Sequence, residues 1–186
     1  AAAVVVVTSD EGFLGELNTL LVNRAMDMKR RFSKVELIVL GERGGRYLQD
    51  VGERFVLFKG VSDEMRYAEA QSLGSYLMKN FGRLFGSVQV IYPEFVSLTM
   101  QRVQEVELLP YRVGDNAKKE FRGRVFVLEP DPARILAALT RLWVDYRLCD
   151  IFHTSKLAEA AARIMHLEGS THELGQANER LRRQYF

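Results

Sequence analysis

A row of apolar residues that recurs in steps of three and four dominates the last third of the chain. It starts with Leu136, Leu139, Trp143 and Tyr146, pauses at Asp150 and His153, and resumes with Leu157, Ala160, Ile164, Leu167, Thr171, Leu174, Asn178, Leu181 and Tyr185. This heptad spacing, with no proline after Pro132, predicts a long helix. A single helix cannot bury such a row, so the pattern also predicts a facing helix with the same repeat.

We expect the two halves of this heptad row to contact different partners. We expect the first half to lie on a globular α/β domain formed by residues 1–130, and residues 131–186 to form the long helix. Past Leu157 that helix would continue for about 30 residues, roughly 45 Å, so the second half needs a partner. The polar members Thr171 and Asn178 are either tolerated by a long two-stranded coil or fix the register of the partner.

Composition excludes several classes of protein. With 186 residues, 47% of them hydrophobic, the chain can form one ordinary core plus an extension. A net charge of +2 with interspersed signs indicates no nucleic-acid partner, and the basic segment at Arg180–Arg183 is better explained as a solvated helix face. Cys149 is the only cysteine, which excludes an internal disulfide and a multi-cysteine zinc site. The apolar start Ala1–Val7 is too short to cross a bilayer.

The first 85 residues alternate between strand and helix patterns. Apolar runs predict strands at Val4–Val7, Val35–Leu40 and Phe55–Phe58, amphipathic periodicity predicts helices at Leu17–Phe32 and Arg66–Phe85, and a turn at Gly41, Gly44 and Gly45 precedes a short helix containing Tyr47 and Leu48. This order predicts a parallel sheet with right-handed crossovers.

The next segments add an antiparallel pair and lead into the long helix. Alternating patterns predict two paired strands at Val88–Val96 and Met100–Leu109. We then expect a loop at Tyr111–Gly123, a last strand at Val125–Leu128, Asp131 as the N-cap and Pro132 at the first helical position. The expected fold is therefore Rossmann-like, a mainly parallel sheet flanked by helices, with a long C-terminal helix that forms part of an antiparallel coiled coil.

No set of residues points to catalysis. The loop Thr8–Glu16 stands where an α/β sheet could hold a phosphate, but it carries Asp10, Glu11 and Glu16 and has no phosphate-binding glycine pattern. We expect a structural turn in which Asp10 and Ser9 cap backbone groups and Gly12 and Gly15 allow positive φ.

The remaining candidate groups are isolated. His153, His166 and His172 lack the i, i+4 spacing of a helical metal pair, and Cys149 has no partner for nucleophilic chemistry. We therefore predict no catalytic residue, cofactor, metal or small-molecule substrate.

Four separated stretches resemble the gamma subunit of rotary F-type ATP synthases. They are Val4–Asn18 with its TSDEGFLGELN turn, the strand pair that ends in Glu107–Pro110, the sequence EPDP at Glu129–Pro132, and Ala161–Met165 in the long helix. The turn departs from the family, which usually has arginine at Glu11, cysteine at Leu14 and a small residue at Glu16. The resemblance covers nearly the whole chain, and after Glu168 it is one of pattern only, through Leu181 and Tyr185.

The resemblance implies a central-stalk rotor subunit that is not itself catalytic. Its partners would be the catalytic alpha and beta subunits, a small epsilon-type stalk subunit and the membrane c-ring, which places it as a peripheral membrane protein on the cytoplasmic side of a bacterial inner membrane or at the equivalent organelle membrane. Arg163, Ile164 and Met165 would lie low on the shaft, where the family meets the catalytic subunits. The family also has an N-terminal helix before the first strand, which would be the partner of the heptad row, and residues beyond Phe186. We expect both ends of this chain to be cut.

Two other functions stay open at this point. The chain could be a doubly wound nucleotide- or metabolite-binding domain that dimerises through its C-terminal helix, with a pocket at the carboxyl ends of the strands. It could also be a structural adaptor with the same fold and no rotation.

The heptad row predicts the behaviour of this chain in isolation. Residues Ile164–Tyr185 should be exposed, so the chain should either self-associate or exchange the amide hydrogens of this segment rapidly. Sedimentation and hydrogen exchange measure both properties. A monomer with a fully protected tail would contradict the interpretation.

Overall fold

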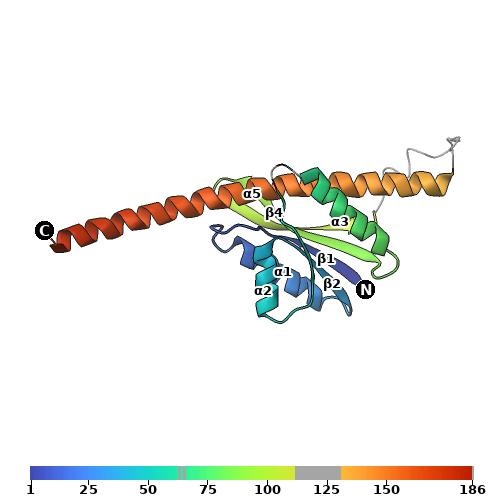
Figure 1. The fold of residues 1–186 in the computed structure, drawn as a ribbon, viewed down its shortest axis with the longest axis horizontal. Helices are drawn as coiled ribbons and strands as arrows, with labels where there is room; N and C mark the ends of the chain where they lie inside the picture. The colour runs from blue at the N-terminus through green and yellow to red at the C-terminus, as the bar shows by residue number, and fades with distance from the viewer. Residues whose placement is uncertain (63, 65, 112–130, 186) are drawn as a thin grey trace.

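The structure, a computed structural model that describes residues 1–62, 64, 66–111 and 131–185, is built on a five-stranded sheet in the order β3-β2-β1-β4-β5 (Figure 1). The strands are β1 (Ala2–Val7), β2 (Val35–Leu40), β3 (Val56–Phe58), β4 (Ser87–Ser97) and β5 (Met100–Leu109). The first four are parallel, and β5 pairs antiparallel with β4. Every residue of β1 is buried, as expected for a central strand covered on both faces. The predicted fold class is confirmed.

Helices cover both faces of this sheet (Figure 1). They are α1 (Leu17–Arg30), α2 (Glu42–Asp50), α3 (Arg66–Asn80) and α5 (Pro132–Tyr185). Alternate residues of β1 point to opposite faces, so Val5 and Val7 pack with α3 and α5, whereas Val4 and Val6 pack with α1. The helix α2 packs beside α1 through Leu48.

The glycines after β2 have a different role from the predicted turn. Only Gly41, with φ of 96°, precedes the helix, whereas Gly44 and Gly45 lie inside α2. A Cβ at Gly44 would lie less than 3.0 Å from Thr8 Oγ1. The hydroxyl of Thr8 donates to the Leu40 carbonyl (2.6 Å) and accepts from the Gly44 N–H (3.1 Å). Gly44 is therefore required for close packing rather than for a turn.

The helix α3 ends at Asn80, five residues before the predicted end at Phe85. Gly82, with φ of 79°, turns the chain, and its N–H donates to the Phe85 carbonyl instead of to a helical acceptor. The predicted helical face at Leu84 is consequently exposed.

The start of the long helix is confirmed. The Asp131 carboxylate accepts a hydrogen bond from the Arg134 N–H (3.3 Å), and Pro132 is the first helical residue. The predicted strand Val125–Leu128 and all of the predicted loop except Tyr111 lie outside the described residues.

The helix α5 is 54 residues long, about 80 Å. It crosses the face of the sheet beside α3 and then projects well beyond the body (Figure 1). Its buried residues are Val144, Asp145, Leu148, Ile151, Phe152, Ser155, Ala158, Glu159, Ala161 and Ala162. The expectation that the first half of the heptad row lies on the body is wrong, because Leu136 and Tyr146 are each 66% exposed. Within the described residues no helix combines the length and hydropathy needed to cross a membrane.

Two glycine substitutions test this packing. Gly44→Ala should destabilise the fold by about 1–3 kcal/mol, because the added methyl group overpacks the buried Thr8 contact. Gly175→Ala is the matched control: nothing lies within 4 Å of its Cβ position, so the better helix propensity should stabilise the helix by about 0.5–1 kcal/mol. Urea unfolding measures both changes, and equal effects of the two substitutions would contradict the close approach.

Candidate interaction site: the exposed row and the neck of the long helix

The heptad row faces solvent along its whole length. Its exposed members include Leu139, Leu157, Ala160, Ile164, Leu167, Leu174, Asn178, Leu181 and Tyr185. The exposed fraction reaches 71% at Leu174 and 81% at Tyr185. Trp143 is only half buried, against the ring of Tyr111 at a centroid distance of 4.9 Å. Large apolar side chains in a continuous exposed stripe mark a surface that another element covers.

A second heptad row on α5 explains why the first one is exposed to solvent. Its members are Val144, Leu148, Ile151, Ser155, Ala158 and Ala162, which also recur in steps of four and three. We call it the buried row, because these residues pack on the sheet and on α3. At 100° per residue the two rows lie on nearly opposite sides of the helix. The buried row could have been found from the sequence by testing every heptad phase rather than the most apolar one.

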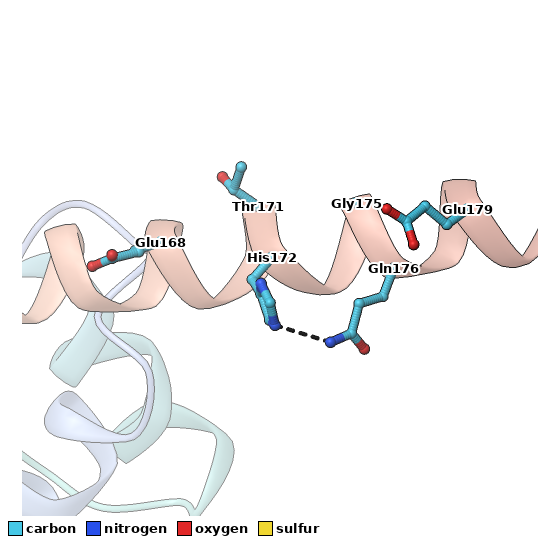
Figure 2. Close-up of a pocket in the computed structure, with 6 residues that line it drawn as sticks. All are labelled: Glu168, Thr171, His172, Gly175, Gln176 and Glu179. Carbon is cyan, nitrogen blue, oxygen red and sulfur yellow. Dashed lines mark hydrogen bonds between the residues drawn. The ribbon is translucent and has the colours of Figure 1, made fainter.

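Beyond Ala162 no described residue of α5 is buried. Figure 2 shows a shallow hollow on this part of the helix, lined by Glu168, Thr171, His172, Gly175, Gln176 and Glu179. Thr171, a member of the heptad row, points away from His172 and Gln176, whose side chains form a 2.9 Å hydrogen bond. All six residues belong to one helix, so the hollow lacks the second wall that a ligand pocket needs.

The helix leaves the body at a cluster of charges that we call the neck, formed by Asp10, Glu11, Lys156, Glu159 and Arg163. Glu159 is only 4% exposed, and its carboxylate is 3.1 Å from Lys156 Nζ. Burial raises the pKa of Glu159 above its ordinary value, the positive charges of Lys156 and Arg163 oppose this, and the negative charge of Asp10 adds to it.

One predicted partner-binding residue connects the helix to the body at the neck. Arg163 Nη2 lies 2.9 Å from Glu11 Oε2, although without the alignment of a hydrogen bond, so the contact is an ion pair. Three residues on, the ring of His166 lies 6.3 Å from that of Phe13. The neighbouring Ile164 and Met165 are exposed.

The loop that follows β1 contains Asp10, Gly12 and Gly15, the residues of the predicted structural turn. Asp10 Oδ1 accepts hydrogen bonds from the N–H groups of Glu42 (2.9 Å) and Gly60 (3.2 Å), so its carboxylate caps backbone groups, one of them at the first residue of α2. Positive φ occurs at Gly15, as expected, but at Phe13 instead of Gly12. Asp10 thereby ties together the chain segments that follow β1, β2 and β3.

This arrangement bears on the ligand-binding alternative. The crevice of a doubly wound fold lies where the strand order reverses, here between β1 and β4. The neck residues Glu159 and Arg163 of α5 stand next to the loop that follows β1, with Asp10 and Glu11 facing them. Asp10 also lines an open hollow, together with the carboxylate of Glu42 and with Lys59. A phosphate in that hollow would face two carboxylates and one ammonium group.

Other chemical groups are dispersed. Among the described residues, no three His, Cys, Asp or Glu side chains are close enough to hold a metal ion. Cys149 is partly buried, and burial raises the pKa of its thiol, with a smaller contribution from Asp145. A thiol with a raised pKa is mostly protonated at neutral pH and is therefore a poor nucleophile.

The fold and the exposed row define an α/β protein whose long helix carries a coiled-coil surface with no partner among the described residues. A family model described as ATP synthase matches residues 1–186. The chain therefore belongs to the ATP synthase family, and the relatives it matches there are gamma chains.

Those relatives come from diverse bacteria. The chain is 24% identical over 182 residues to the ATP synthase gamma chain of Pelotomaculum thermopropionicum, covering 96% of this chain and 64% of that one. It is 29% identical over 176 residues to the gamma chain of Symbiobacterium thermophilum, covering 91% and 59%. The chain thus spans less than two thirds of the length of these relatives.

Solved structures share the fold. The central stalk and c-ring structure of the Tetrahymena thermophila mitochondrial ATP synthase contains a similar chain, with a TM-score of 0.73, 19% identity, and coverage of 92% of this chain and 76% of that one. The rotor of the Euglena gracilis mitochondrial ATP synthase gives a TM-score of 0.70 at 16% identity, over 99% and 71% of the two chains.

The buried carboxylate of Glu159 predicts a pH dependence of stability. Its pKa in the folded state is raised above the ordinary 4.5, so its favourable contribution is complete below pH 4.5 and is lost as the pH rises through the raised value. Each pKa unit corresponds to about 1.4 kcal/mol. Glu159→Gln should therefore gain stability relative to the wild type as the pH rises from 4.5, which urea unfolding at several pH values measures. Glu179→Gln, on the exposed tail, is the control, and parallel curves for Glu159→Gln and the wild type would contradict the assignment.

Proposed function

We propose that this chain is the central-stalk rotor subunit of an F-type ATP synthase, which couples ion flow through a membrane ring to ATP synthesis or hydrolysis by rotation. It is a non-catalytic subunit, and the chemistry takes place in the alpha and beta subunits of the catalytic hexamer. Membership of the ATP synthase family supports the proposal. The observation that carries it is the heptad row, whose members from Leu136 to Tyr185 are exposed apart from the half-buried Trp143.

An antiparallel helix is the occupant that the heptad row fits. The row keeps its 3.5-residue spacing both over the body and beyond it, so one partner helix could follow α5 over about 70 Å. A shaft transmits torque only if it resists bending and twisting. Two interlocked helices supply this stiffness, whereas a lone helix of this length with no packed face is marginally stable in water.

The partly buried Arg163 and the exposed residues at and beyond the neck are the proposed contacts with the shaft helix and the catalytic subunits. They are Arg163, Leu157, Ala160, Ile164, Met165, Leu167, Leu174, Asn178, Leu181 and Tyr185. As an asymmetric shaft turns, it presents different side chains to each catalytic subunit. The conformations of the sites would then shift through differential contact, which is how a non-catalytic subunit can drive a reaction elsewhere.

The α/β body would meet the c-ring and a small epsilon-type subunit. This places the protein as a peripheral membrane component on the cytoplasmic side of a bacterial inner membrane or at the equivalent organelle membrane. The solved central-stalk structure from Tetrahymena thermophila, in which a similar chain occurs together with a c-ring, supports this arrangement.

Assembly tests the proposal directly. The chain, with any flanking sequence that its gene encodes, is mixed with alpha and beta subunits from the same source, and complex formation and ATPase activity are measured. We expect a complex whose turnover depends on this chain. If the folded chain does not assemble, the rotor function is wrong, and titration of nucleotides against the body would then test the ligand-binding alternative.

Substitutions in the exposed row should separate assembly from folding. Leu167→Asp and Leu174→Asp should leave the unfolding of the isolated chain nearly unchanged, within about 0.5 kcal/mol, because both side chains are already exposed. In the complex each should weaken assembly strongly, because a carboxylate would be buried without a partner. Glu173→Asp, beside the row, is the control. Normal assembly of both leucine variants would contradict the role of the row.

A further inference from the structure

Two polar contacts hold α5 to the body at opposite ends of its buried stretch. One is at the neck, where Arg163 pairs with Glu11. The other lies about 33 Å away along the helix, where Arg141 contacts Asp145 and α3. Between them the helix contacts the body through the buried row.

The contact at Arg141 is specific in geometry. Arg141 Nε donates to Asp145 Oδ2 (2.8 Å), and its Nη2 donates to the Gln71 carbonyl (3.1 Å) and to Ser75 Oγ (2.8 Å) of α3. Asp145 is only 8% exposed. It fits against α3 only because Gly74 has no side chain, since a Cβ there would lie less than 3.0 Å from Asp145 Oδ1.

The apolar contacts of the buried row alone offer little resistance to rotation of α5 about its own axis. Toward the neck its members are small, namely Ser155, Ala158 and Ala162, so their ridges are shallow. Apolar contacts are also non-directional, so a small rotation of the helix about its own axis replaces one set of apolar contacts by another set of similar energy. Ion pairs and hydrogen bonds with fixed partners lose their geometry on such a rotation.

We propose that the Arg141–Asp145–α3 contact and the Arg163–Glu11 contact are two pins that fix the rotational position of α5 on the body. They are positioning residues for torque transfer: with the pins in place, a torque on the body turns the shaft with it instead of rolling the helix in its groove. The role in torque transfer rests on the proposed rotor function, whereas the fixed helix position does not.

The neck pin is the weaker and the more salt-sensitive of the two. The Glu11 side chain is 76% exposed, and an exposed ion pair contributes little free energy and is screened by salt. Its removal therefore should not unfold the chain. The Arg141 pin is partly buried and makes three hydrogen bonds, so salt should affect it much less.

Distances between spin labels measure the position of the helix. Labels are placed at Asp50 on α2 and at His153 on the part of α5 that packs against the body, both exposed, in a Cys149→Ser background. Glu11→Gln removes the neck pin. Arg141→Met with Asp145→Asn removes the other pin without leaving a buried charge unpaired. Arg30→Gln, which breaks the exposed Arg30–Asp27 pair of α1, is the control.

We expect the narrow distance distribution of the wild type to be lost in the pin variants, most completely when both pins are removed, and kept in Arg30→Gln. High salt should reproduce the effect of Glu11→Gln and not that of the Arg141 variant. Cooperative unfolding shows that the variants still fold. An unchanged narrow distribution in the folded variant that lacks both pins would overturn the proposal.

The assembled complex tests the consequence for coupling. With both pins removed, ATP hydrolysis should continue while ions pumped per ATP decrease, a split that a loss of stability alone would not produce. Full coupling despite a widened distribution would overturn the torque role. If the wild-type chain fails to assemble, the rotor function fails, and the distance measurement on the isolated chain still decides whether the pins hold the helix.

Discussion

The packing of the buried row of α5 against the sheet determines what the rest of the molecule can do. One side of the helix completes the hydrophobic core that it shares with β1, β4 and α3. Because the buried row and the heptad row lie on nearly opposite sides of the helix, this contact turns the heptad row outward along its whole length. The helix is therefore fixed to the body and open to a partner at the same time, as the proposed rotor function requires.

The loop after β1 shows how the polar groups at the usual ligand site of a doubly wound fold can serve the fold itself. In a doubly wound protein this loop usually faces a ligand. Here its polar groups are used internally: Thr8 and Asp10 bind the backbone after β2 and β3, and Glu11 faces the shaft. The loop therefore connects α5 to the body through Glu11 and Phe13, which contact Arg163 and His166.

The strands, the antiparallel pair and the start of α5 could be predicted from the sequence because each has a local signal, such as the unbroken apolar run of β1 or the Asp131 cap. Gly44 could not be assigned, since its need for a small side chain comes from Thr8, which is distant in sequence. The prediction of which side of α5 is buried was wrong for a similar reason. Two heptad rows of comparable strength exist, and only the shape of the sheet decides which one is buried. The neck pairs unite residues about 150 positions apart, so no local pattern indicates them.

The seven-residue repeat of α5 explains why acidic residues occur on its packed side. Asp145, Phe152 and Glu159 follow one another at seven-residue intervals, all buried. A purely apolar heptad surface could slide by one repeat and still find apolar contacts. In this helix a slip of seven residues would bring Phe152 to the space at Gly74 that holds a carboxylate, or Asp145 to the site of a fully buried phenyl ring. Either exchange is costly, because one overpacks the contact with α3 and the other places a carboxylate in an apolar site shaped for a phenyl ring. The buried carboxylate of Glu159 reduces the stability of the packed state at neutral pH, as its raised pKa shows, and together with Asp145 it restricts the helix to one axial register.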